Sequence, residues 1–514
     1  MSGKLTDLCA FICQISENDW LVSREKGIYG NREGSEREDE VVFFAKTPRG
    51  EGTIQSIIED LIGMKKDDLV FFHVIAKQLG ESSIHGVYSV TEAPFYNDTT
   101  EIWKSSTHFV FPYRFCFGPH PEHTELCEND VNIGLSEFYR MIESRRLRSI
   151  STLERESRGA AHSVKKISLD DALEITKALH GAFHLKEGDP VKFKPIDIAP
   201  KQPLSQHIRR VGRIEFAVKA LVAHRLALRD PELVKHIPAC RERYEFLIET
   251  FVGQTARKPT DIFIECNRDG KTAVTILEAK VDLANMMDLA QALKYQEIFK
   301  LRNVDRGSLG YDMSTCLLAQ RFDKDLISYS FTRNRVLPHE EVILLKYVPN
   351  KNGTNAEFLN QKLELLESGK NNVYRVISSK APLLDLSSDP SKFCSIFAEK
   401  RFSSRTSLEL KSHENNTIIL RKFYADKDER TCLSHILVHD VQGCCGVPEL
   451  REFMSLVKKE TGCQGHLIVV EPMLLASDYD DEAELFIANY NACDTQTGRH
   501  PISAYIRPTT RGSA

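Results

Sequence analysis

Residues 260–280 read TDIFIECNRDGKTAVTILEAK, and this stretch decides the fold of the central part of the chain. Two apolar runs, 261–265 and 274–279, flank Asn267-Arg-Asp-Gly270, whose composition is typical of a hairpin turn. The pattern therefore predicts two antiparallel strands joined by a tight turn.

Three charged side chains lie at the open end of this predicted hairpin. Glu278 and Lys280 are two residues apart on one strand, so their side chains project from the same face. Asp261 begins the other strand, and the hairpin can bring it close to them. Carboxylates bind a hard divalent cation, and a lysine stabilises developing negative charge. The three side chains together therefore suit metal-assisted hydrolysis of a phosphodiester.

This arrangement resembles the PD-(D/E)xK nuclease superfamily, to which many restriction and repair endonucleases belong. The helical stretch 208–228 carries Glu215, which is similar to the helix-borne glutamate of that family. Gln291-Ala-Leu-Lys-Tyr295 resembles the Gln-x-x-x-Tyr helix that follows the Glu-x-Lys strand. One departure is Thr260 directly before Asp261. The resemblance covers residues 205–350, and the segments that resemble its closing strands are 316–320, 328–330, 333–334 and 342–347.

The resemblance implies that Asp261 and Glu278 bind Mg²⁺, for which Mn²⁺ can substitute, together with the backbone carbonyl of Ala279. Lys280 would orient the attacking water, Glu215 would complete the acidic site, and Gln291 would support it or touch the phosphate. The alternative interpretation is structural, since a Glu-x-Lys at a strand end is commonly a solvated ion pair. A buried carboxylate at position 215 needs a cationic partner in either case, because an unpaired one costs several kcal/mol. Arg225 or a neighbouring lysine is the alternative partner.

Residues 1–125 form a strand-rich segment that is similar to PUA-like domains of the EVE and YTH kind, which are small β-barrels that bind a modified or flipped base. The similarity rests on Trp20-Leu-Val, Asp67-Asp-Leu-Val-Phe-Phe, Gly86-Val-Tyr-Ser-Val, Trp103 and Phe111-Pro-Tyr-Arg114. An extruded base can stack between aromatic side chains, so Trp20 and Trp103 are candidates for nucleic-acid binding. The alternative is that these aromatic residues fill the core of the domain.

The length of 514 residues predicts about three domains. We expect a multidomain chain of the α/β and α+β classes, with no internal repeat evident. Its predicted parts are a PUA-like barrel (1–125), a helical connector (126–204), a restriction-endonuclease-like α/β nuclease core (205–350) and a small α/β domain of unassigned role (351–514). No run of eighteen apolar residues occurs, and the 13 cysteines form no CxxC pair. A cytoplasmic protein without a membrane span is expected.

The net charge of −5 argues against a surface that binds nucleic acid everywhere, so local charge matters more. Arg209, Arg210 and Arg213 are candidate phosphate contacts, although they could equally form the solvated face of a helix. The sequence thus predicts a Mg²⁺-dependent DNA endonuclease of the restriction or defence type, whose N-terminal domain recognises a base. Alternatives are a structure-specific repair nuclease and a non-catalytic protein that binds DNA or RNA. The resemblance also implies a homodimer, since many members of that superfamily cut both strands as dimers.

Overall fold

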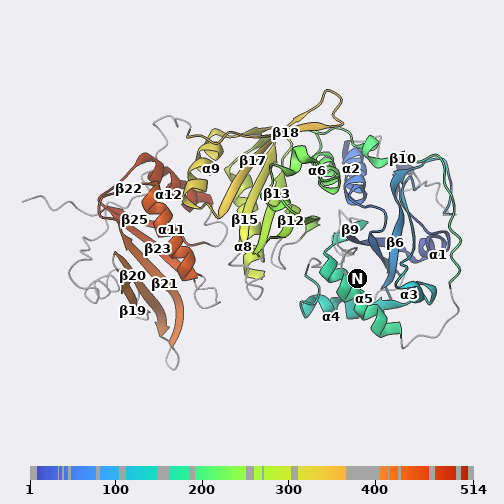
Figure 1. Cartoon of the computed structure of the whole chain (residues 1–514), viewed down its shortest axis with the longest axis horizontal. Helices are drawn as coiled ribbons and strands as arrows, with labels where there is room; N and C mark the ends of the chain where they lie inside the picture. Colours follow the sequence, from blue (N-terminus) through green and yellow to red (C-terminus); the bar gives the residue numbers. More distant parts are fainter. Residues whose placement is uncertain are drawn as a thin grey trace, which may run out of the picture.

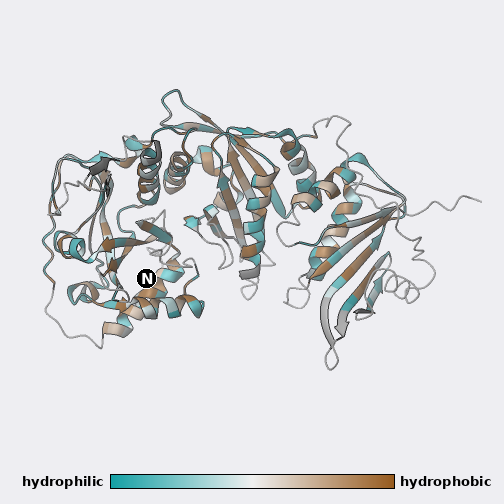
Figure 2. Cartoon of the chain, turned by 180° about the vertical axis from the view of Figure 1, so that it is seen from behind, coloured by the Kyte–Doolittle hydropathy of each residue, from teal (hydrophilic) through white to brown (hydrophobic). Residues whose placement is uncertain are grey.

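The computed structural model describes three large sheets with their helices, which follow one another along the long axis of the molecule (Figure 1). The described residues are 8–506 except 33, 38–39, 44–47, 77–80, 104–110, 149–162, 184–190, 251–259, 269–270, 303–310, 366–405, 415, 426–429, 462–468 and 494–498. Hydrophobic residues, coloured brown in Figure 2, lie along the strands of these sheets and on the helices that pack against them. The multidomain α/β class expected from the sequence agrees with this architecture.

The central sheet contains the predicted hairpin. Its strand order is β11-β12-β13-β15-β17-β18, and the strands are Tyr244–Thr250, Thr260–Arg268, Lys271–Ala279, Asp312–Ala319, Glu340–Pro349 and Ala356–Asn360. β12 and β13 pair antiparallel, with Arg268 opposite Lys271 at the turn. β13, β15 and β17 are parallel, and helices α8 (Met286–Arg302) and α9 (Lys324–Val336) connect them. Parallel neighbours require such crossovers, which gives this unit its α/β character.

Two local predictions for this unit were wrong. Residues 328–330 and 333–334 lie in helix α9, not in strands, because buried Leu326, Tyr329 and Arg333 recur at helical spacing. The helix predicted to start at residue 208 begins only at Glu215, as α6 (Glu215–Ala227). Gly212 has a φ of +91°, outside the right-handed helical region, so the segment before α6 cannot be helical.

The N-terminal unit is built on a mixed sheet of order β2-β7-β6-β5-β1-β9. The strands, in chain order, are β1 (Ala10–Ser16), β2 (Ile28–Asn31), β5 (Leu69–Ile75), β6 (Ser83–Tyr96), β7 (Tyr113–Pro119) and β9 (Val164–Ile167). β1 runs parallel to β5, and the other neighbours are antiparallel. Among the described strands, the two edge strands β2 and β9 do not pair with each other. The sheet is therefore open here and not the closed barrel that the sequence predicted.

Residues 126–204 add both helices and strands to this N-terminal unit. β9 pairs with β1, while β8 (Asn132–Gly134) and β10 (Gln202–Pro203) pair with β6. Helices α4 (Leu135–Glu143) and α5 (Leu169–Phe183) bury apolar residues against the sheet, in one cluster with Ile12 and Phe71. The segment expected to be a helical connector is therefore integrated into the N-terminal sheet.

The N-terminal and central units share a hydrophobic core. Helix α2 (Pro48–Ile62) packs against α6, and the two lie side by side in Figure 1. One continuous apolar cluster includes Ile58 and Leu61 of α2, Val218 and Leu221 of α6, and Ile264 of the central sheet. Burial of this shared surface holds the two units together.

The described part of the C-terminal unit combines one large sheet with two helices. Its sheet has the order β19-β20-β21-β23-β25, with strands Thr406–Glu414, Thr417–Ala425, Arg430–Asp440, Val470–Ala476 and Ser503–Ile506. Helices α11 (Val447–Thr461) and α12 (Asp481–Cys493) cover the face that is turned toward α9 of the central unit (Figure 1). The order of strands and helices from β19 to β25 repeats that from β11 to β17, and β18 has no counterpart among the described residues. No internal repeat was expected from the sequence.

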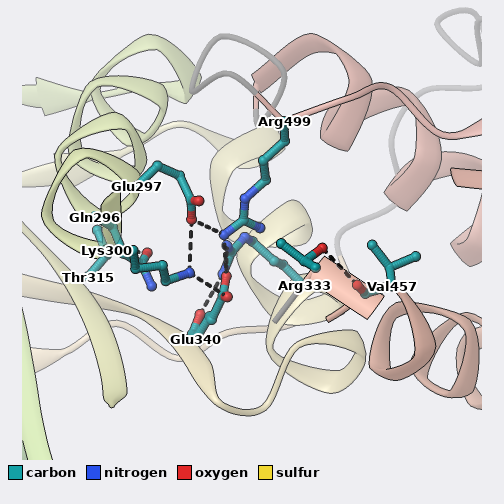
Figure 3. Close-up of polar contacts among 9 residues, drawn as sticks. Gln296, Glu297, Lys300, Thr315, Arg333, Glu340, Val457 and Arg499 are labelled. Carbon is teal, nitrogen blue, oxygen red and sulfur yellow. Dashed lines mark hydrogen bonds and ion pairs between the residues drawn. The ribbon is translucent and has the colours of Figure 1, made fainter. Parts of the chain in front are cut away.

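A buried ion network joins the C-terminal unit to the central one. Figure 3 shows that Arg499 reaches from the C-terminal unit to Glu297 of α8 and to Glu340 at the start of β17. The Arg499 Nη2 atom lies 2.7 Å from Glu340 Oε2, and the Lys300 Nζ atom lies 2.7 Å from Glu340 Oε1. Burial opposes ionisation of Glu340, but the charges of Arg499, Lys300 and Arg333 outweigh it and hold its pKa well below 4.5.

We expect Arg499→Met to lower the free energy of unfolding by about 1–3 kcal/mol at neutral pH, because it leaves two buried carboxylates with fewer cations. The pKa values of Glu340 and Glu297 are lowered in the folded protein, so this stabilisation is present above about pH 4.5 and is lost as the pH falls. Urea unfolding at pH 7 and at roughly pH 3.5 measures both effects. Arg321→Met is the control, since the Arg321–Asp282 pair is exposed. Equal stability of the two variants at pH 7 would contradict the network's role.

Candidate active site

The strand register brings Asp261 and Glu278 face to face. Ile262 lies opposite Leu277, so the next pair toward the open end of the hairpin is Asp261 and Glu278. The amide nitrogen of Asp261 donates to Glu278 Oε1 at 3.3 Å, and the hydroxyl of Thr260 donates to the same oxygen at 3.1 Å. The amide nitrogen of Ala279 donates to Asp261 Oδ2 at 2.7 Å. The structure therefore brings together the two carboxylates that the sequence singled out and fixes both by hydrogen bonds.

Lys280 lies beside this carboxylate pair. Its Nζ atom is 4.0 Å from Glu278 Oε2 and 3.9 Å from Asp288 Oδ1 at the start of α8. Its amide nitrogen donates to the carbonyl oxygen of Leu318 at 2.7 Å, which anchors the backbone at the end of β13. The side chain is 22% exposed. The backbone of Lys280 is therefore held in place, while its ammonium group remains accessible to solvent.

Gln291 connects helix α8 to the carboxylate pair. Its side-chain nitrogen lies 3.4 Å from Glu278 Oε2 and 3.1 Å from the hydroxyl oxygen of Tyr295, one helical turn further along. The Gln-x-x-x-Tyr spacing singled out in the sequence therefore places both side chains on the face of α8 that is turned toward the site. Gln291 orients the carboxylate of Glu278.

Helix α6 contributes an acid and a buried cation from the other side. Glu215, the first residue of α6, is partly buried and interacts electrostatically with Asp261 and Lys280. Lys219, one turn later, has a side chain that is only 2% exposed. Its Nζ atom lies 3.5 Å from Asp261 Oδ1 and 3.6 Å from Glu59 Oε1, and it also pairs with Glu249. The charge of Lys219 also acts on Glu215, so Lys219 is the neighbouring lysine that the sequence offered as one alternative partner of this glutamate.

Lys219 was not among the residues predicted from the sequence, although its spacing from Glu215 points to it. Lys219 lies four residues after Glu215 and interrupts the apolar run 216–223, so it faces the same side of α6 as the glutamate. Arg225, the other candidate partner of Glu215, pairs instead with Asp230 and donates to Asn355 at 2.6 Å. Glu59 could not be connected to the site, because it comes from α2 of the N-terminal unit.

Burial, helped by neighbouring charge, raises the pKa values of Glu278 and Glu215. Burial, together with the charge of Asp261, raises the pKa of Glu278 to about 8. Burial and the same aspartate also raise the pKa of Glu215. Burial disfavours the charged form of Lys219, but Glu59, Asp261 and Glu215 outweigh it and raise its pKa. The site thus carries an excess of acidic groups.

The donor set at this site suits magnesium. Within the part of the chain that the structure describes, no three His, Cys, Asp or Glu side chains gather closely enough to form a metal cluster. Asp261 and Glu278 provide two carboxylates. Magnesium is commonly bound by one or two carboxylates, with waters and substrate phosphate oxygens as the remaining ligands. The side chains present therefore fit Mg²⁺ better than a metal that needs a complete protein cage.

The arginine and tryptophan candidates have different surroundings. Arg209, Arg210 and Arg213 are exposed in the segment before α6, and Arg210 forms an ion pair with Glu51 at 2.8 Å. The two tryptophans are buried, Trp20 at 3% and Trp103 at 4% exposure. In this structure neither indole ring is open to solvent, which favours the interpretation that these residues fill the core.

Aromatic and polar neighbours enclose both indole rings. Trp20 lies 4.8 Å from Phe72 and 5.8 Å from Tyr88, measured between ring centroids. The indole nitrogen of Trp103 donates to the hydroxyl of Ser23 at 2.9 Å, and Arg114 lies over the ring. Stacking of a base on either ring would require these neighbours to move.

Comparisons with known proteins give little guidance. No family model matches the chain, and no curated protein matches it. Among solved structures, the chain is similar to the human THYN1 protein in complex with 5-methylcytosine-containing DNA, at 9% identity and a TM-score of 0.19. The match covers 35% of this chain and 99% of that one, but so low a TM-score carries no argument about fold or function. No helix among the described residues combines the length and apolar character needed to cross a membrane.

Proposed function

We propose that this chain is a metal-dependent nuclease that hydrolyses phosphodiester bonds at the open end of the β12–β13 hairpin. The observation that carries the proposal is the pairing of Asp261 with Glu278, with Lys280 Nζ 4.0 Å from Glu278. Two opposed carboxylates, one of them with a pKa raised to about 8, are not needed to form the hairpin. Such a perturbed pair is typical of a functional site.

Each side chain has a distinct task in this proposal. Asp261 and Glu278 would hold Mg²⁺, which when bound polarises the phosphate and lowers the pKa of a water. The ammonium group of Lys280 stabilises the negative charge that develops on the phosphoryl oxygens. Thr260 and Gln291 hold Glu278 in position by hydrogen bonds, and such supporting contacts tune a metal site.

The exposed arginines give the nucleic acid a path to this site. Arg209 and Arg213 lie shortly before Glu215, so they belong to the same end of α6 as the acidic residues. We take DNA as the substrate and RNA as the alternative. A restriction or defence role, with a base recognised by the N-terminal unit, is part of the proposal, but the burial of Trp20 and Trp103 requires that other side chains contact the base.

The test is to incubate purified protein with modified DNA, unmodified DNA and RNA, in Mg²⁺, in Mn²⁺ and with a chelator. We expect cleavage of at least one substrate with either metal, and loss of that cleavage when the metal is removed. Preference for modified DNA would support the defence role, whereas cleavage of branched, unmodified DNA would support repair. A folded protein that cuts none of these substrates would refute the nuclease proposal.

The double variant Arg209→Ala/Arg213→Ala is expected to weaken binding about equally for all sequences, because phosphate contacts carry no sequence information. Each lost contact should reduce the slope of log K against log salt by about 0.9 for duplex DNA, so the slope should fall by roughly 2. Fluorescence anisotropy at several salt concentrations measures it. Arg140→Ala on α4 is the control, since this arginine is 70% exposed and lies far from α6 in the chain. An unchanged slope would exclude these arginines from the interface.

A further inference from the structure

The C-terminal unit has the same strand pairing as the central unit. In the central unit, β12 and β13 form an antiparallel hairpin, and β13, β15 and β17 are parallel. In the C-terminal unit, β20 and β21 form the hairpin, and β21, β23 and β25 are parallel. Each unit also has a second, two-stranded parallel sheet, β14–β16 in one and β22–β24 in the other. Two helices connect the parallel strands in both cases.

Main-chain hydrogen bonds fix which residues correspond. In each unit, the residue directly after the second hairpin strand donates its amide N–H to a carbonyl oxygen of the next parallel strand, at the last residue but one of that strand. In each unit, the residue directly before the second helix also donates its amide N–H to a carbonyl oxygen in the first strand of the small sheet. The equivalent bonds are Lys280 to Leu318 (2.7 Å) and Val441 to Leu475 (2.8 Å), then Asp323 to Ala284 (3.0 Å) and Asp480 to Cys445 (3.1 Å).

The correspondence identifies the residues that stand at the active-site positions. Asp261 lies opposite Glu278, and Thr417 lies opposite His439 in the equivalent hairpin. Thr417 therefore takes the place of Asp261, and His439 takes the place of Glu278. By the hydrogen bonds above, Val441 takes the place of Lys280.

The replacements remove the chemistry of the site. The hydroxyl of Thr417 and Nδ1 of His439 are 2.9 Å apart, so these two side chains satisfy each other. Val441 is 8% exposed and belongs to an apolar cluster with Leu450 and Phe453 of α11. Asp440 stands at the position of Ala279, and alternation along the strand turns it to the opposite face. These positions provide neither the two opposed carboxylates nor the ammonium group.

The two units pack through their connecting helices. Helix α9 of the central unit contacts α11 and α12 of the C-terminal unit, and all three lie between the two sheets in Figure 1. Leu326 and Tyr329 of α9 share one apolar cluster with Leu450 and Phe486. Arg499 adds the ion network to this interface. One chain thus contains two firmly joined units that share the hairpin, the parallel strands and the two connecting helices.

We propose that the C-terminal unit is a catalytically silent second copy of the nuclease fold, so that each chain has one cation-binding centre and cuts one strand per binding event. The cleavage part of this inference rests on the nuclease function proposed above. Cutting both strands at one locus would require a second chain or a second encounter, because only one of the two units carries the opposed carboxylates and the lysine.

The first arm of the test measures Mn²⁺ binding to the full chain by titration calorimetry. We expect Asp261→Asn/Glu278→Gln to lose the binding seen in the unaltered protein. We expect Thr417→Val and His439→Gln, each tested alone to limit damage to the fold, to retain it. Binding that survives in the first variant and disappears in His439→Gln would overturn the inference, as would no binding in any protein.

The second arm follows cleavage of supercoiled plasmid at low protein concentration. We expect open circles to accumulate before linear molecules, at a rate that the substitutions at 417 and 439 leave within about twofold. Linear product formed without open circles by a monomeric chain would overturn the single-strand inference. An absence of all cleavage, together with Mn²⁺ binding that depends only on Asp261 and Glu278, would refute the nuclease function and leave the silent copy supported.

Discussion

Replacement of Asp261 by asparagine is expected to reduce the rate of phosphodiester cleavage by roughly 10³-fold or more. The substitution removes one of two carboxylates that would hold the cation. It keeps a side-chain oxygen that can accept the hydrogen bond from the amide nitrogen of Ala279, now 2.7 Å from Oδ2. The local fold should therefore survive, and the loss should reflect the missing charge.

Initial cleavage rates in saturating Mg²⁺, together with nucleic-acid binding measured in parallel, test this expectation. Binding should fall far less than the rate, because the exposed arginines and not Asp261 contact the phosphates in our proposal. Asp282→Asn is the matched control, since this nearby aspartate is 65% exposed and pairs with Arg321. It should cleave at close to the normal rate. Comparable activity in the Asp261 variant would remove Asp261 from the active site.

Replacement of Lys219 by methionine is expected to lower the free energy of unfolding by about 3–5 kcal/mol, the usual cost of removing one partner from a buried ion pair. Methionine fills a similar volume, so the loss of charge dominates. Glu59, Glu249 and Asp261 all lie around Lys219 Nζ, and Glu59 is fully buried. Without the lysine, these carboxylates must become protonated or move apart.

Urea unfolding at neutral pH measures the effect of Lys219→Met. Lys235→Met is the control, because Lys235 forms an exposed ion pair with Glu232 and should change stability by less than about 1 kcal/mol. Adding Glu59→Gln to the Lys219 variant should restore part of the lost stability, since it removes one of the uncompensated charges. Full stability of Lys219→Met would contradict the assignment of Lys219 as the cation that balances the site.

The core of the candidate site was predictable because alternation along a strand is a local rule. Glu278 and Lys280 are two residues apart on one strand, which places them on the same face. The hairpin turn pairs this strand with the one that carries Asp261. Helical spacing likewise placed Gln291 and Tyr295 together. These relationships depend on short stretches of chain, which is why the sequence alone was sufficient.

Contacts between distant segments were not predictable in the same way. Glu59 reaches Lys219 only because α2 packs on α6, and no local pattern links residues so far apart. The late start of α6 depends on the left-handed conformation of Gly212, which a helical apolar pattern does not reveal. The burial of Trp20 depends on aromatic neighbours from three strands.

The repeated strand pairing was not predicted from the sequence, for a related reason. Sequence repeats are detected from similar side chains, whereas these two units share main-chain register and buried apolar positions. The chemically distinctive residues differ: Thr417, His439 and Val441 stand where Asp261, Glu278 and Lys280 stand in the other unit. Strand pairing was needed to align them.

The most direct test of the account is a crystal of the protein grown with Mn²⁺, examined by anomalous scattering. We expect a peak within bonding distance of one carboxylate oxygen of Asp261 and one of Glu278, with Lys280 beside it. A peak that avoids both carboxylates, or none at a Mn²⁺ concentration that saturates binding in solution, would contradict the central claim that these two side chains form a cation site.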